Sequence, residues 1–106
     1  MNNKKMDCPV EITLSIIGSK WKVLILRELL DGTKRFSELG RGVSGITQKM
    51  LTQQLRQMEK DGIVNRKVYP VVPPRVEYSL TTIGKSLKPI LNAMCKWGSA
   101  YKNLKR

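Results

Sequence analysis

Apolar residues recur at helical spacing along the first part of the chain. Pro9 suits the first turn of a helix, because its missing N–H leaves no backbone bond unmade there. The apolar face of this segment carries Val10, Leu14 and Ile17. Ser19 can cap a second helix. Residues Trp21–Leu30 are apolar around most of the helix circumference, which is typical of a core helix. The pattern therefore predicts two helices, the second ending at Asp31-Gly32.

A short helix and a longer amphipathic helix are expected next. Thr33–Phe36 is short and could be extended, and Ser37 is expected to cap a short helix that ends around Gly40 and Gly42. Thr47–Asp61 is the clearest amphipathic helix, with Thr47 as its N-cap. Its apolar stripe consists of Leu51, Leu55 and Met58.

The pattern changes to that of strands after Gly62. Residues 63–71 are rich in β-branched and aromatic residues, and residues 75–80 alternate between polar and apolar side chains. Pro70, Pro73 and Pro74 interrupt the two runs, and proline cannot donate to a strand ladder. Two strands around a proline-rich loop predict a β-hairpin.

The C-terminal segment carries a heptad seam. Thr81 or Thr82 can cap a last helix, and Pro89 inside it is expected to produce a kink. Apolar residues spaced alternately 4 and 3 apart form the seam: Ile83, Leu87, Ile90, Met94, Trp97, Tyr101 and Leu104. Such a seam packs against another helix.

These elements predict a mainly α fold with a small β-hairpin, of the α+β class. A short helix, a turn, a longer polar-faced helix and a following hairpin form a winged helix-turn-helix. Residues 1–8 are expected to be a flexible arm. Residues 9–106 are expected to form one DNA-binding domain, whose C-terminal helix spans 81–105.

The net positive charge of the chain limits the partners that it can bind. The 106 residues include 20 Lys and Arg against 8 Asp and Glu, a formal net charge of +12. No acid occurs from Leu39 to Met58, from Gly62 to Val76 or from Tyr78 to Arg106. A field of this sign attracts polyanions. With no long apolar run and no signal-peptide core, the expected place of action is the cytoplasm, with no membrane partner.

The sequence lacks histidine and a set of cysteines at metal-ligand spacing, which makes metal or acid–base chemistry a weak interpretation. There is no histidine, and the two cysteines are not at ligand spacing. Histidine is the commonest general base, and a zinc site needs about four ligands. We therefore expect no metal, no cofactor and no enzymatic activity.

The amphipathic helix 47–61 carries the side chains that could read DNA. They are Gln48, Lys49, Thr52, Gln53 and Arg56. Gln and Arg can pair with adenine and guanine edges in the major groove, and Thr can contact a thymine methyl. A solvated helix face is the alternative for any one of them, but the total charge and the following hairpin favour DNA.

The hairpin and two helix starts offer cations for the DNA backbone. Arg66, Lys67 and Arg75 flank the proline-rich loop, where a wing would place them on phosphates or in the minor groove. Lys20 and Arg35 stand at helix starts or turns, where backbone N–H groups can also hold phosphate. Ordinary surface charge is the competing interpretation.

Cys8 is the candidate thiol sensor. It precedes Pro9 and a helix start, and nearby Lys4 and Lys5 are positive, all of which favour a reactive thiolate. An idle, exposed thiol is the alternative. Cys95 lies beside the heptad seam and is expected to be a small packing residue.

Several runs of residues resemble HxlR-type regulators, a MarR-like group of winged-helix proteins. These runs are Cys8–Glu11, Ile17–Trp21, Gly32–Leu39, Ile46–Leu55, Tyr69-Pro70, Pro73–Thr81 and Gly84. Met58-Glu59 stands where such proteins often have Leu-Glu. The resemblance covers about residues 8–101.

The resemblance implies a homodimer joined through its N- and C-terminal helices, on a pseudo-palindromic operator. The residues then expected at the interface are Val10, Leu14, Ile17, Leu87, Ile90, Met94, Trp97 and Tyr101. In some members a cysteine at the place of Cys8 senses oxidants or electrophiles. Two other functions compete with a sequence-specific regulator: non-specific coating of DNA, and binding of an acidic protein or membrane.

Overall fold

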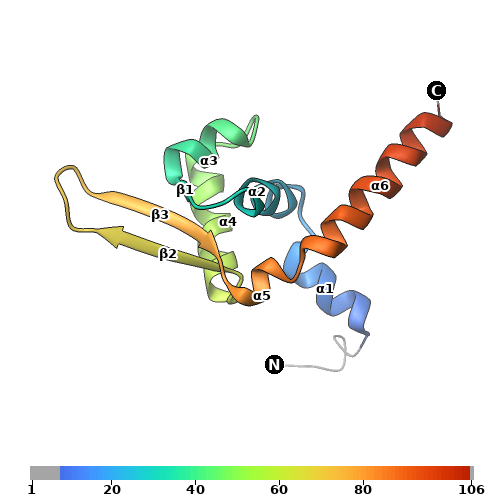
Figure 1. Cartoon of the computed structure of the whole chain (residues 1–106), viewed down its shortest axis with the longest axis horizontal. Coiled ribbons are helices and arrows are strands. Elements are labelled where there is room, and N and C mark those ends of the chain that lie inside the picture. Colours follow the sequence, from blue (N-terminus) through green and yellow to red (C-terminus); the bar gives the residue numbers. More distant parts are fainter. Residues whose placement is uncertain (1–7, 106) are drawn as a thin grey trace.

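The computed structural model describes residues 8–105 as a set of helices with a small antiparallel sheet that projects to one side (Figure 1). The expected arm is residues 1–8, and residues 1–7 of it lie outside the described residues; Cys8 directly precedes α1. The elements in chain order are α1 (Pro9–Ile17), α2 (Lys20–Leu30), β1 (Lys34–Arg35), α3 (Phe36–Gly42), α4 (Gln48–Lys60), β2 (Val64–Tyr69), β3 (Arg75–Leu80), α5 (Thr82–Lys85) and α6 (Lys88–Leu104).

The elements form a central body with two projections. In Figure 1 the β2–β3 hairpin extends to one side of the body and α6 to the other, with α2, α3 and α4 between them. Helix α3, the following turn, α4 and the hairpin are the predicted winged helix-turn-helix, which is thereby confirmed. A group of buried apolar side chains from α2, α3, α4 and the sheet forms the core.

Local signals at α1, α2 and α4 are confirmed. Pro9 occupies the first turn of α1, and the Ser19 hydroxyl caps α2 by accepting the backbone N–H of Lys22 at 3.1 Å. The Thr47 hydroxyl caps α4 through the N–H of Met50 at 3.1 Å. The α4 stripe of Leu51, Leu55 and Met58 is buried.

The cap of α3 differs from the expectation. Ser37 lies inside the helix, and Arg35 is the residue that precedes the first turn. The carboxylate of Glu38 accepts the backbone N–H of Arg35 at 2.7 Å. A reciprocal bond of this kind fixes a helix start as a serine cap does, so the helix begins earlier than the position of Ser37 suggested.

The predicted hairpin is confirmed, and a third strand joins it. The sheet order is β1-β3-β2, with both neighbours antiparallel to β3. Arg66 pairs with Tyr78, and Lys67 with Glu77. Because successive side chains of a strand point to opposite faces, Arg66 and Lys67 lie on different faces of the sheet.

The C-terminal helix is divided, which corrects the prediction of one kinked helix. Helix α5 ends at Lys85, and α6 begins at Lys88 with Pro89 in its first turn. Proline is favoured there because the first turn requires no N–H donor. The break also divides the seam: Leu87 is buried in the core of the domain, whereas Ile83 is 66% exposed.

The start of α5 packs closely against the turn that follows α4, and we call this contact the junction between the two helices. The Thr81 hydroxyl donates to the carbonyl oxygen of Gly62 at 2.6 Å and accepts the N–H of Gly84 at 3.0 Å. Gly62 has φ +78°, which glycine adopts without strain. A Cβ on Gly84 would clash with the carbonyl oxygen of Ile63. The start of the C-terminal segment therefore packs directly against the turn that follows α4.

Within residues 8–105, no helix is both long and apolar enough to span a bilayer. The same part of the chain contains no group of three or more His, Cys, Asp or Glu side chains that could hold a metal ion.

Candidate nucleic-acid interface

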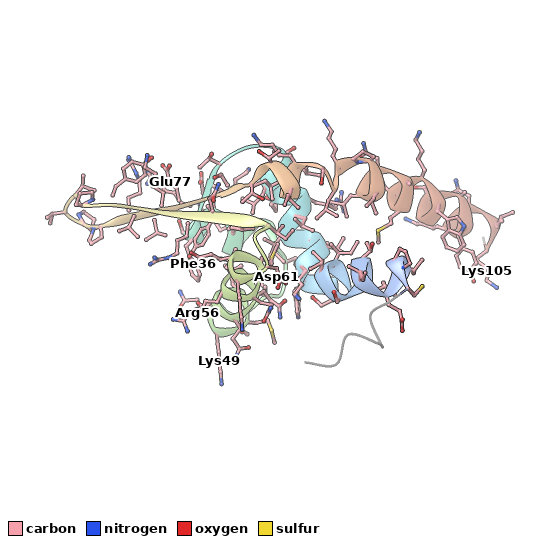
Figure 2. The ribbon with its side chains drawn as sticks, turned by 90° about the horizontal axis from the view of Figure 1, so that it is seen from below. Phe36, Lys49, Arg56, Asp61, Glu77 and Lys105 are labelled. Carbon is pink, nitrogen blue, oxygen red and sulfur yellow. The ribbon has the colours of Figure 1, made fainter. Side chains whose placement is uncertain are left out.

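One groove contains all five polar residues expected to read DNA. It has a volume of about 510 Å³ and is lined by Gln48, Lys49, Thr52, Gln53 and Arg56 of α4 together with Phe36 of α3. In Figure 2, Lys49 and Arg56 project on the side of the molecule where α4 protrudes. Helix periodicity thus placed these five side chains on one surface, as the sequence predicted.

The other glutamines of α4 are held by contacts inside the protomer. The Gln54 amide donates to the Met50 sulfur at 3.5 Å, and its oxygen accepts from the Ser19 hydroxyl at 3.4 Å. The Gln57 amide donates to Asp61 at 3.2 Å. Gln48 and Gln53 are exposed in the groove and are therefore the glutamines available to a ligand.

Arg66 lies on the α4 side of the hairpin. It lines a second groove with Thr52, Leu55, Arg56, Glu59 and Tyr78. Thr52 and Arg56 belong to both grooves, so the polar face of α4 continues into the base of the hairpin. A single anionic ligand could therefore contact Arg56 and Arg66 together.

Lys67 and Arg75 lie on the opposite face of the sheet. Both cations stack on the Tyr69 ring, with Lys67 Nζ 4.9 Å and Arg75 Cζ 4.4 Å from its centroid. Arg75 Nε also pairs with Glu77 at 3.4 Å. The sequence grouped these cations with Arg66, but strand alternation separates them and partners within the sheet engage them.

Arg35 and Lys20 occupy two further positions around the interface. Arg35 is opposite Glu77 in the sheet and lines a groove between α3 and the hairpin loop. The Lys20 ammonium lies 4.7 Å from the centroid of the Trp21 ring, at the first turn of α2. The bond from Ser19 to Gln54 brings that turn beside α4.

Phe36 is a residue of the α4 groove that the sequence did not single out. Its ring is half-buried, packs against the core and lines both the α4 groove and the loop groove. Figure 2 shows it between the hairpin and α4. The relevant signal is its position directly after β1, but only the pairing of β1 with β3 places it there.

A separate apolar groove lies between α1, α2 and α6. It has a volume of about 800 Å³, and its apolar lining includes Val10, Leu14, Ile17, Ile90 and Met94. Further along α6, the rings of Trp97 and Tyr101 stack with centroids 5.1 Å apart, and Trp97 is 68% exposed. The structure thus brings together most of the expected interface residues, but Leu87 belongs to the core and Ile17 is buried at the groove.

Both thiols are exposed. Cys8 immediately precedes α1, as expected. Cys95 was expected to be a packing residue, but it is exposed beside a cavity that Arg27 and Lys88 also line. The reason is its position on α6, on the other side of the helix from the apolar groove.

Comparisons with known proteins identify relatives over most of the chain. A model of the HxlR-like helix-turn-helix family matches residues 16–106. An HTH-type transcriptional regulator from Methanothermobacter thermautotrophicus is 54% identical over 101 residues, 95% of this chain and 77% of that protein. Among solved structures, reduced HypR, a redox regulator, has 52% identity and a TM-score of 0.87, over 92% of this chain and 96% of HypR. A MarR-family regulator from Porphyromonas gingivalis has 37% identity and a TM-score of 0.85, over 93% and 95% of the two chains.

Proposed function

The chain belongs to the HxlR-like helix-turn-helix family of DNA-binding transcriptional regulators, which are not enzymes, and from this premise we propose that it recognises a specific sequence in duplex DNA. The observation that carries the proposal is the α4 groove, where two glutamines, a threonine, a lysine and an arginine share one exposed surface. Such side chains match the donors and acceptors of base edges in the major groove.

In this proposal α4 enters the major groove and the hairpin contacts the flanking backbone. Arg66 supports the arrangement because it lines one groove together with Arg56, so that one anionic ligand could reach both side chains. Lys20, Arg35, Lys67 and Arg75 supply additional positive charge around the site. Phosphate contacts fix the register of the protein on the duplex, while the α4 side chains select the bases. A protein acting in this way works at the chromosome, in the cytoplasm.

We further propose a homodimer through α1 and α6. The groove lined by Val10, Leu14, Ile90 and Met94 is apolar and open, and the stacked Trp97–Tyr101 pair extends the exposed apolar surface along α6. Contiguous apolar surface on a small protomer indicates a protein contact. A two-fold dimer would present two copies of α4 to an inverted repeat.

Cys8 is proposed as a redox-responsive residue of this dimer. Its thiol is exposed at the start of α1, the helix that forms one wall of the apolar groove. HypR, a structure similar over most of this chain, is a redox regulator. Oxidation of a thiol at that place would change the N-terminal edge of the proposed subunit interface.

The experiment is selection of bound duplexes from a random DNA pool at physiological salt. Recovery of an inverted repeat, with half-sites about 10–10.5 base pairs apart or a multiple of that, would support a dimeric sequence reader. Displacement by random competitor DNA as readily as by any selected site would instead identify a protein that coats DNA through charge alone. Equal binding to other polyanions would favour an acidic protein or a membrane surface as the partner.

A further inference from the structure

Phe36 gives the α4 groove an aromatic wall. The five α4 residues in the groove are all polar or charged, and Phe36 enters it from a different element, the start of α3. One part of the ring packs against the core, and the remainder stays accessible. A half-buried aromatic surface inside a polar groove presents a contact for an apolar group of the ligand.

The backbone on both sides of Phe36 is fixed. Arg35, the preceding residue, pairs with Glu77 in the sheet. Its N–H also bonds to Glu38 in the first turn of α3. Sheet pairing and helix capping thus hold the backbone at Phe36 before any ligand arrives, and one side of its ring packs against the core. A preorganised contact costs little ordering entropy on binding.

Duplex DNA offers one apolar group at the base edges of the major groove, the C5-methyl of thymine. A polar edge in front of the ring would lose its hydrogen bonds to water and gain no partner, which is unfavourable. An aromatic wall beside base-reading glutamines therefore favours thymine over the other bases.

We propose that Phe36 is a specificity-determining residue that packs against the C5-methyl of one thymine in each half-site. The inference rests on the proposed function and deepens it, because it assigns one operator position to a residue outside the recognition helix. Thr52 is the competing source of an apolar contact, since it lines the same groove and its side chain carries a methyl group.

The test replaces each thymine of the selected operator by deoxyuridine, one position at a time, and measures binding of the full chain. Deoxyuridine keeps the hydrogen-bonding edge of thymine and removes only the methyl group. We expect the affinity to fall about fourfold at one position in each half-site, as estimated for one buried methyl group.

Two variants assign that effect to a side chain. Phe36→Leu retains apolar packing against the core but shortens the side chain, and it should abolish the difference between thymine and deoxyuridine at that position. Thr52→Ser removes the competing methyl group, keeps the hydroxyl and should leave the difference intact. The deoxyuridine scan itself uses the unaltered protein, so it does not depend on how either variant folds.

Three outcomes would overturn the inference. A selected operator with no methyl-sensitive thymine would exclude the Phe36 contact while leaving the proposed function in place. Loss of the methyl effect in Thr52→Ser but not in Phe36→Leu would assign the contact to Thr52. Failure to select any sequence would overturn the proposed function, and the Phe36 inference with it.

Discussion

Gln53 is exposed in the α4 groove, whereas Gln54 and Gln57 are held by hydrogen bonds within the protomer. We expect Gln53→Ala to lose about 1–3 kcal/mol of binding at one base pair of the operator, because a base-reading side chain discriminates locally. Binding to single-base operator variants would measure this. Gln57→Ala is the matched control and should leave base preference unchanged. If Gln53→Ala weakened binding to all sequences equally, Gln53 would not read a base.

Arg66 and Lys67 are neighbours in sequence on opposite faces of the sheet, and they make a matched pair. Arg66 adjoins the α4 groove, so Arg66→Ala should weaken binding to all sequences and reduce the slope of log K against log salt by about one unit. Lys67→Ala should change that slope less, because Lys67 stacks on Tyr69 away from α4. If Lys67→Ala changed the salt slope more than Arg66→Ala did, DNA would instead lie against the face of the hairpin that carries Tyr69.

Cys8 and Cys95 are both exposed, which makes each the control for the other. We expect Cys8→Ser to abolish a change in DNA affinity on treatment with a thiol oxidant, and Cys95→Ser to retain it, because only Cys8 adjoins the proposed interface at α1. The measurement is operator binding before and after oxidation and after re-reduction. A response that persists in Cys8→Ser would exclude Cys8 as the sensor.

At the residue scale, sequence reasoning grouped the five candidate base-reading side chains of α4 correctly on one surface, but it did not find the side chains that engage the cations of the hairpin. Helical periodicity alone put the five α4 residues on one surface. The Tyr69 ring and Glu77, which engage Lys67 and Arg75, depend on strand pairing. Phe36 was missed for the same reason: its place in the groove follows from the pairing of β1 with β3, which has no local sequence signal.

At the element scale, the sequence predicted a helix or strand boundary correctly where a capping residue or a proline marks it. Ser19, Thr47 and the proline-rich loop produced correct boundaries for α2, α4 and the hairpin. The prediction of a kink at Pro89 was wrong, because proline can either kink a helix or occupy the first turn of a new one, and here it lies in the first turn of α6. The start of α3 is fixed by Glu38, whose carboxylate accepts the backbone N–H of Arg35. From the sequence, Ser37 is the expected cap instead, because serine is a common N-cap residue.

The junction between α5 and the end of α4 allows a test at this scale. Gly84→Ala should destabilise the protein by about 1–3 kcal/mol, because its Cβ would overlap the carbonyl oxygen of Ile63. Gly40→Ala is the control: it is also helical, its Cβ would meet only the Leu51 side chain at 3.9 Å, and it should be neutral or stabilising. Chemical denaturation would compare them. Equal stabilities would show that the junction relaxes freely.

At the scale of the whole molecule, two substitutions in α6 test the proposed dimer. Met94 lines the apolar groove, whereas Asn92 lies on another side of α6. Met94→Asp should weaken the dimer by about 3–5 kcal/mol, because it places an unpaired charge in the interface. Asn92→Asp introduces the same carboxylate and should leave the dimer intact. Sedimentation equilibrium would measure both, and two stable dimers would contradict an interface at this groove.

The apolar groove between α1, α2 and α6 also has a consequence for gene dosage. In the proposed dimer, only paired subunits present two copies of α4 to an operator. Below the dissociation constant of the dimer, mass action makes the paired form vary with the square of the subunit concentration. While the operator is also far from saturated, halving expression would then lower its occupancy about fourfold. The strength of packing in this groove would therefore set the expression threshold at which the regulated promoter begins to respond.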